Sequence, residues 1–405
     1  MGSELNVDAI LTGRVTQRGD LLEIATELVD THSGWRLWGQ PYVRGINDLM
    51  TVPEDITREI SEKLRISLTR DEKRRLSKSD TRNPNAYVLY LKGRHHWNNG
   101  TEDALRKSIP CYEQAIKDDS SFALAYACLA DSYSMLGFYG ILSPGVSFGG
   151  AEHAAQRALE IDATLADAHA SLGFVAFHYT WHRPEAEEAF KRAIKLNSRT
   201  AKFRFWYAWY LAANERFSEA TAQIQEAKRL EPVSVFAISY AGFVFYLARE
   251  YDRAFACFRE ALEVQPDFAP ARWWLGLSYI ETDQYEEAIG ELQKSITYSR
   301  GHPSPTAALG HLYGRLGWLA DEQAIFQALT ELSGKRFLER GMCPHWILQS
   351  AGLVDQTKIW RSNGWKKRAR SGQACSCMQE SCLCWITSGR SPACKRCCAE
   401  SGTNA

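Results

Sequence analysis

The stretch YDRAFACFREALEVQP, residues 251–266, has a residue spacing that recurs along the chain and that indicates the fold. Ala254, Phe258 and Ala261 lie four and three residues apart, and Pro266 follows five residues later. Thirty-four residues earlier, the same intervals separate Ala220, Ile224, Ala227 and Pro232. The order small, large, small, proline is therefore repeated with a fixed period.

The same register extends over four successive units of the chain. It gives three sets of positions: Ala186, Ala220, Ala254 and Ala288; Phe190, Ile224, Phe258 and Leu292; Ala193, Ala227, Ala261 and Ser295. A further small residue recurs upstream as Gly173, Ala208, Gly242, Gly276 and Gly310, with one extra residue in the unit that begins near Ala166. Two helices cross closely only where a side chain is small and a large neighbour fills the space beside it. Each unit is therefore predicted to be a helix, a turn, a second helix and a proline stop.

This pattern resembles the tetratricopeptide repeat, whose period is about 34 residues. The resemblance covers residues 85–334, with seven units that begin near Asn85, Phe122, Ala166, Ala201, Val235, Ala269 and Pro303. It implies a mainly α fold, a right-handed superhelical solenoid whose concave groove is lined by the first helix of each unit. Pro110 is expected to kink the second helix of the first unit. The insertion FYGILSPGVSFGG, residues 138–150, is expected to form a loop.

In the register of the resemblance, aromatic residues line the concave side of the first helices. The predicted groove residues are Phe174, Lys202, Phe205, Trp209, Phe243, Tyr246 and Trp273. Tetratricopeptide domains that bind chaperone C-termini carry Lys and Asn there, whereas Phe205 and Trp209 stand at such positions here. An apolar-anchored protein or peptide ligand is therefore favoured. The alternative is that these rings pack between neighbouring units.

A different period precedes the repeats. Within residues 9–45, Leu22, Ile24, Thr26 and Leu28 alternate with polar neighbours, which predicts a strand with one buried face. Turns at Arg18–Asp20 and Thr31–Gly34 imply one strand on either side of it. A helix is expected to follow, with Thr51 and Glu54 as a capping box and Ile56, Ile60 and Leu64 on one face. The segment 77–85 reads as a linker.

This junction resembles bacterial multidomain regulators in which a TolB-like α/β domain precedes tetratricopeptide repeats. The matching stretches are VDAILTGRV, LVDTHSGWRLWGQPY, DITREISEKL and NPNAYVLYLKGR. The resemblance implies that residues 1–80 are an incomplete TolB-like α/β segment with one exposed sheet edge, that residues 81–340 are the array, and that residues 341–405 are a tail. In that family a serine/threonine kinase, a nucleotide cyclase or a winged-helix DNA-binding domain supplies the output. Such a domain, encoded separately, is a candidate partner.

Composition bounds the remaining possibilities. The chain of 405 residues is 45% hydrophobic and 24% charged, which is ordinary for folded protein. Its net charge is zero, so bulk charge does not favour nucleic-acid binding by the main body. No apolar run approaches the roughly 18 residues of a membrane span, and the start lacks a signal-peptide pattern, so a cytoplasmic location is expected.

The C-terminal tail differs in composition from the rest. Seven of the eleven cysteines lie between Cys375 and Cys398, and residues 358–405 hold nine Lys or Arg against two Asp or Glu. One interpretation is a zinc site, although Cys394 and Cys397 alone have the common spacing. The other interpretation is that the tail is unstructured sequence, for which translation out of frame would be one origin.

No motif indicates catalysis. The chain has no phosphate-binding loop, no H-E-x-x-H and no G-x-S-x-G. His95 and His96 are adjacent and point apart on a helix, and His182 and His311 are alone, so no metal or other cofactor is expected. Glu187-Glu188 and Glu286-Glu287 are interpreted as solubilising charges on outward faces. The predicted function is a non-catalytic binding scaffold; the alternative is the detached sensory region of a kinase, cyclase or winged-helix regulator.

Overall fold

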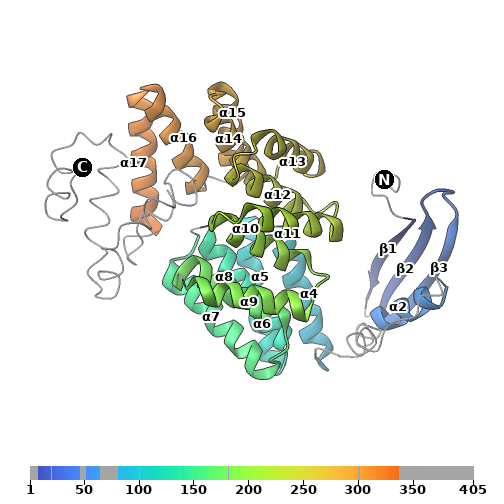
Figure 1. Cartoon of the computed structure of the whole chain (residues 1–405). Coiled ribbons are helices and arrows are strands. Elements are labelled where there is room, and N and C mark those ends of the chain that lie inside the picture. The colour runs from blue at the N-terminus through green and yellow to red at the C-terminus, as the bar shows by residue number, and fades with distance from the viewer. Residues whose placement is uncertain are drawn as a thin grey trace. The chain divides into compact units, whose positions relative to one another are not determined.

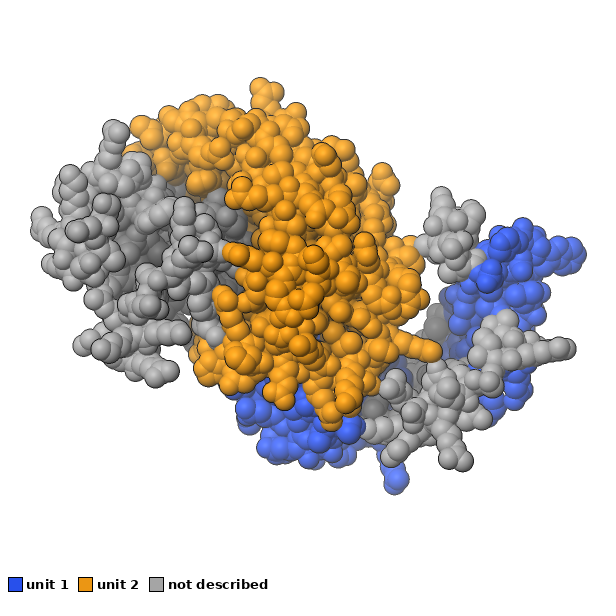
Figure 2. Space-filling view, viewed as in Figure 1, with its two compact units in different colours: residues 1–132, 151–172 blue, residues 133–150, 173–405 orange. Residues whose placement is uncertain are grey.

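A computed structural model of the chain describes residues 8–19, 21–45, 52–63, 81–99, 101–139, 141–180, 182–299 and 302–336. The chain divides into two compact units, blue and orange in Figure 2. Unit 1 comprises residues 1–132 and 151–172, and unit 2 comprises residues 133–150 and 173–405. The division cuts through helices, and it groups residues 133–150 with the later part of the chain. The domain boundaries expected near residues 80 and 340 lie outside the described residues and stay predictions.

Unit 1 begins with a three-stranded antiparallel sheet in the order β1-β2-β3 (Figure 1). The strands are β1 (Ala9–Arg18), β2 (Leu21–Asp30) and β3 (Arg36–Gly45), and helix α2 (Val52–Lys63) follows. Leu22, Ile24 and Leu28 are buried in one cluster with side chains of β3, and Ile56 and Ile60 of α2 pack against it. The predicted alternation along β2 is confirmed. Thr51 and Leu64 lie outside the described residues.

The described residues then form seven helix pairs, labelled in chain order in Figure 1. They are α4 (Pro84–Asn98) and α5 (Glu102–Asp118); α6 (Ala123–Phe138) and α7 (Pro144–Ile161); α8 (Ala166–Val175), continued by the π-helical η2 (Ala176–Thr180), and α9 (Arg183–Leu196); α10 (Ala201–Ala213) and α11 (Phe217–Leu230); α12 (Val235–Leu247) and α13 (Tyr251–Val264); α14 (Ala269–Glu281) and α15 (Tyr285–Tyr298); α16 (Pro303–Leu316) and α17 (Leu319–Arg336). Each first helix begins within one residue of its expected position, so the predicted array of paired helices is confirmed.

In unit 2 the pairs stack because the first helices α10, α12 and α14 each contact both their own partner and the next first helix. In unit 2, α10 packs on α11 and α12, and α12 packs on α13 and α14. The three sets of small and large residues predicted at the crossings are buried, with relative exposures of 0–1%. A Cβ built on Gly242 would lie 2.5 Å from the Phe258 ring, and one on Gly276 would lie 2.8 Å from Leu292. The absence of a side chain in the first helix therefore makes room for the large residue of the second.

The turn inside each of the last four pairs contains a left-handed residue. Glu215, Arg249, Asp283 and Gly317 have φ values of 61°, 61°, 59° and 75°, and they recur every 34 residues. The following amide N–H donates back into the first helix, as from Arg216 to the carbonyl of Leu211 at 3.0 Å. The sequence did not predict these positions, because three of the four are not glycine.

One local expectation is corrected, and a second stays a prediction. The insertion 138–150 is not a loop throughout: Pro144–Gly150 form the start of α7, where proline suits the first turn of a helix. Pro110 lies inside α5, which is helical from Glu102 to Asp118, and the kink expected there stays a prediction. The Cys-rich tail, with its zinc and unstructured interpretations, lies outside the described residues.

Replacing Gly242 by Ala should destabilise the fold. The new methyl group meets the Phe258 ring, and such overpacking costs about 1–3 kcal/mol. Gly290→Ala is the matched control in α15, because nothing lies within 4 Å of its Cβ position and alanine favours a helix. Urea unfolding followed by circular dichroism should give a lower midpoint for Gly242→Ala and an equal or higher one for Gly290→Ala. Equal midpoints for the parent and Gly242→Ala would contradict the close crossing.

Candidate functional site: an aromatic ladder on the first helices

A ladder of four aromatic rings runs across consecutive first helices in unit 2. Each ring directly follows the small residue of its helix crossing, which fixes it at the same place in every repeat. We name these residues the aromatic ladder: Phe138, Phe174, Trp209 and Phe243. Ring centroids are 6.1 Å apart from Phe138 to Phe174, 6.1 Å from Phe174 to Trp209 and 5.5 Å from Trp209 to Phe243, all edge to face. That geometry is favourable for aromatic pairs.

The other predicted groove residues join the ladder to different extents. Phe205 stacks on Tyr240 at 4.6 Å, and Tyr240 lies 5.7 Å from Trp209. Tyr246 stacks on Phe243 at 6.1 Å. Trp273 is connected to the ladder through its neighbour Trp274, which stacks on Phe243 at 4.8 Å. Lys202 is apart from the ladder, with its ammonium 5.2 Å from the Trp206 ring.

All six aromatic members of the predicted groove set are buried. Their relative exposures are 0% for Phe174, 3% for Trp273, 4% for Phe205, 5% for Trp209, 7% for Phe243 and 8% for Tyr246. Their ring contacts agree with the alternative in which aromatic residues pack between repeats. Whether the same rings also bind a ligand stays a prediction.

The sequence interpretation missed Phe138, Phe177, His178, Tyr240 and Trp274. The signal for Phe138 was present, because the same pair of a small residue and an aromatic residue recurs along the chain. The successive pairs are Gly137-Phe138, Gly173-Phe174, Ala208-Trp209 and Gly242-Phe243, and the intervals between them are 36, 35 and 34 residues. The insertion concealed this register. His178 had no such signal, because its position depends on the π-helical turn of η2.

His178 lies in a box of aromatic rings. Its ring centroid is 4.2 Å from Phe174, 4.3 Å from Phe177 and 4.5 Å from Trp209. Phe138 lies 5.4 Å from it. The Nε2 atom is buried and has no hydrogen-bond partner in the described part of the chain. Burial lowers the pKa of His178 to about 3, so the imidazole is neutral at pH 7. Single π-helical turns inside α-helices are often associated with functional sites.

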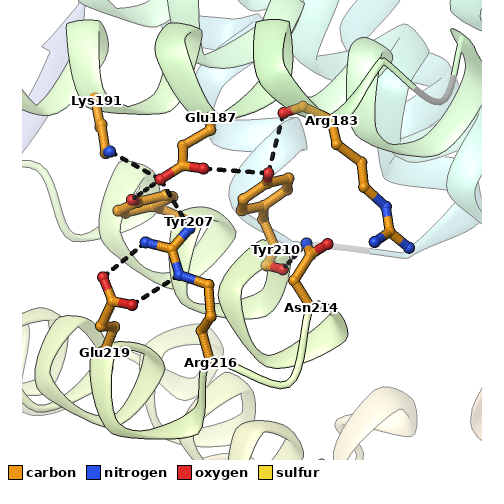
Figure 3. A network of polar contacts seen from close by, with 8 residues as sticks. All are labelled: Arg183, Glu187, Lys191, Tyr207, Tyr210, Asn214, Arg216 and Glu219. Atoms are coloured by element: carbon orange, nitrogen blue, oxygen red, sulfur yellow. Dashed lines mark hydrogen bonds and ion pairs between the residues drawn. The ribbon is translucent and has the colours of Figure 1, made fainter. Parts of the chain in front are cut away.

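A polar network fastens the repeat beside this box (Figure 3). The Glu187 carboxylate accepts from Lys191 Nζ and Arg216 Nη1, both at 2.8 Å, and from the Tyr207 hydroxyl at 3.1 Å. Tyr210 donates to the Arg183 carbonyl at 3.0 Å, and its ring meets Phe177 at 5.5 Å. The network is therefore connected through Tyr210 to the Phe177 ring, which also contacts His178.

The surroundings of Glu187 correct the expectation that its charge only solubilises the outer face of the array. Its side chain is 23% exposed, whereas Glu188, Glu286 and Glu287 are exposed as expected. Partial burial alone would raise the pKa of Glu187, but hydrogen bonds from Lys191, Arg216 and Tyr207 outweigh it and lower the pKa to about 2. The carboxylate is a structural hub rather than an acid or base.

The remaining polar candidates do not assemble into a site. His95 and His96 lie on α4 with ring centroids 5.8 Å apart, and His182 pairs with Glu185 at 2.9 Å. Within the described ranges, no three His, Cys, Asp or Glu side chains are grouped so that they could hold a metal ion. Among the described residues, no helix has the length and apolar character that crossing a bilayer requires.

Comparisons with known proteins identify the repeat. The tetratricopeptide repeat family model matches residues 182–234 and 244–304. A solved structure of an IFIT1 monomeric mutant with Gppp-AAAA is 12% identical, with a TM-score of 0.54 over 86% of this chain and 75% of that chain. At that identity the likeness shows the fold alone. The chain therefore contains tetratricopeptide repeats in a helical array.

Two curated relatives are longer than the matched region. "Putative adenylate cyclase 3" of Rhizobium meliloti is 33% identical over 91 residues, which are 22% of this chain and 16% of the relative. The transcriptional regulator HilA of Salmonella typhimurium is 26% identical over 152 residues, which are 37% of this chain and 27% of the relative. The matches thus span less than a third of the length of either relative.

Glu187→Gln should destabilise unit 2 through loss of the network. Hydrogen bonds to a charged group contribute about 1.5–3 kcal/mol, so we expect a loss of about 1–2 kcal/mol at pH 7. Because the folded pKa is lowered, the parent has this stability above pH 4.5 and loses it as the pH falls towards 2. The difference between parent and variant should therefore shrink in acid. Denaturant midpoints of the parent, Glu187→Gln and the exposed control Glu188→Gln test this prediction. Equal losses of stability in the two variants would contradict the structural role of the Glu187 carboxylate.

The neutral His178 should make the fold sensitive to mild acid. Its pKa is lower in the folded chain than the usual 6.5, so stability is complete above pH 6.5 and falls towards pH 3. The loss should be no more than about 1.4 kcal/mol per pH unit, because a single proton is involved. His178→Phe should reduce this slope between pH 7 and pH 5, measured by urea unfolding with tryptophan fluorescence. The control His153→Phe, at an exposed histidine, should keep the parental slope. A parental slope in His178→Phe would contradict the buried neutral imidazole.

Proposed function

We propose that this protein is a non-catalytic scaffold that binds a protein or peptide partner on the first-helix side of its tetratricopeptide repeats, around the aromatic ladder. The repeats support a binding role, because successive first helices present one extended surface. The observation that carries the proposal is the concentration of aromatic rings there, since aromatic anchors dominate protein interfaces. Phe174, Trp209 and Phe243 are the proposed anchors, with Phe205, Tyr246, Trp273 and Lys202 around them.

Electrostatics supports an apolar rather than a carboxylate-anchored partner. Lys202 is the only cation in the predicted set, and its ammonium already lies 5.4 Å from the Phe203 ring and 5.2 Å from the Trp206 ring. A partner would therefore gain most from burying aromatic or aliphatic side chains. Polar groups at the edge of the surface would set its orientation.

A selection of displayed random peptides on the full chain tests the proposal. Trp209→Leu should weaken the selected peptides at least about tenfold, because hot-spot truncations typically cost 2 kcal/mol or more. Trp318→Leu is the matched control, because Trp318 is 48% exposed and lies outside the ladder. Circular dichroism should confirm that both variants keep the parental helix content. Peptides that bind all three chains equally would remove the ladder from the binding site.

A second function is favoured by the relatives. Their names include an adenylate cyclase and a transcriptional regulator, and the matches span only a fraction of each. The proposal is that the sheet and the array form the sensory region of such a regulator, with residues 1–80 as part of a TolB-like α/β domain. The neighbouring reading frames test it: a kinase, cyclase or winged-helix protein encoded there should bind the full chain in a two-hybrid assay. Absence of binding by every such neighbour contradicts this second function.

A further inference from the structure

The first helix of the array is buried on one face, whereas an inner first helix is buried all round. Helix α12 is buried at every residue from Ala237 to Tyr246, because the pairs on both sides of it, α10 and α11 and then α13 and α14, contact it. In α4 the buried residues are Ala86, Tyr90 and Gly93. This face packs on α5, where a Cβ built on Gly93 would lie 2.5 Å from the Tyr112 ring. No helix pair precedes α4 in the described residues, so a preceding repeat does not cover its opposite face.

A groove of about 280 Å³ follows that opposite face of α4. Its lining residues recur at helical spacing, and we name them the α4 groove: Val88, Leu91, Lys92, His95 and His96. Successive residues of a helix are about 100° apart, which puts these five across the helix from its buried face. Leu91 is 39% exposed, and Val88 is half-buried. The α4 groove therefore offers apolar surface on the side where an inner first helix receives the preceding pair.

The α4 groove is also basic. The α4 sequence, PNAYVLYLKGRHHWN, has one lysine, one arginine and two histidines and no Asp or Glu. In the described part of the chain, Lys92, His95 and His96 form no ion pair with a carboxylate, whereas exposed cations elsewhere do, as Arg106 does with Glu102 at 3.0 Å. Unpaired cationic and donor groups beside apolar surface favour a partner that brings carboxylates.

We propose that the α4 groove is a docking site for an acidic amphipathic helix of a partner protein. The site is separate from the aromatic ladder, so this inference goes beyond the proposed function. An apolar stripe of the docked helix would pack on Val88 and Leu91. Its Asp or Glu side chains would accept hydrogen bonds from Lys92 and from the two histidines. Recognition of this kind, with a helix lying in a groove, uses anchors one turn apart.

The array itself shows why the occupant is a helix. Second helices pack on the next first helix in the inner repeats, as α11 does on α12, α13 on α14 and α15 on α16. The α4 groove is the corresponding place at the first repeat, and residues 88–96 extend over about 12 Å of helix. A short turn joins each second helix to the next first helix, so the two are antiparallel. The first turn of a docked helix would then lie near His95 and His96, where acidic residues suit both the groove and the helix dipole.

Helix α15 supplies a defined probe. Its sequence YEEAIGELQKSITY, residues 285–298, has Glu286 and Glu287 in the first turn. A fluorescein-labelled peptide of this sequence is titrated with the full chain at low salt, and binding is followed by fluorescence anisotropy. The parent should bind it saturably. Leu91→Glu should weaken binding at least about tenfold, because it places a carboxylate in the apolar part of the groove and repels an acidic helix.

Further variants separate this effect from a loss of folding. Lys92→Glu reverses a charge at an exposed residue and should weaken binding at least about threefold. Leu319→Glu is the matched control, because Leu319 is 63% exposed and lies outside α4, and it should bind like the parent. Circular dichroism should show parental helix content in all three variants. A peptide with Gln in place of its three glutamates should bind the parent at least about threefold more weakly.

The inference is overturned if the parent does not bind the peptide saturably, or if Leu91→Glu and Lys92→Glu bind it like the parent. Equal binding of the glutamine peptide also overturns it. Self-association of the parent in sedimentation velocity that Leu91→Glu abolishes would make a second copy the occupant in place of a partner protein. Trp209→Leu should bind the α15 peptide like the parent, so the α4 groove and the aromatic ladder can fail separately. Loss of peptide binding in Trp209→Leu alone would assign the peptide to the ladder and overturn the inference.

Discussion

The close approach of a small residue in one helix to a large residue in the next is the constraint on which this structure depends. Gly242 admits the Phe258 ring, and the same relation recurs between Gly276 and Leu292. Because the small residue sits at a fixed place in each first helix, the residue after it is also fixed in space. The aromatic ladder is a direct consequence: the crossing positions one ring per repeat, and neighbouring rings come into edge-to-face contact.

The packing of the helices was predictable from the sequence, and the state of the aromatic surface was not. The register of Ala254, Phe258 and Ala261 specifies burial at a helix crossing, and volume alone decides it. Whether Trp209 is open to a ligand depends on segments far away in the chain, among them the end of α6. The π-helical turn at His178 and the network around Glu187 likewise depend on tertiary partners, which a single-sequence register does not contain.

The proposed binding surface and the stabilising core consist of the same side chains in unit 2. Trp209 contacts Phe138, Phe177, His178 and Tyr240 in addition to its neighbours in the ladder. A partner bound at the proposed surface would therefore exchange contacts rather than simply add them.

The left-handed residues Glu215, Arg249 and Asp283 bear on how the array assembles. A residue with a β-carbon adopts this backbone conformation at a cost of about 1–2 kcal/mol, which a lone helical hairpin has little means to offset. The contacts with adjoining hairpins must supply the difference. Folding in this region should accordingly be cooperative over several hairpins, and a single pair cut from the middle of the chain should remain largely unfolded.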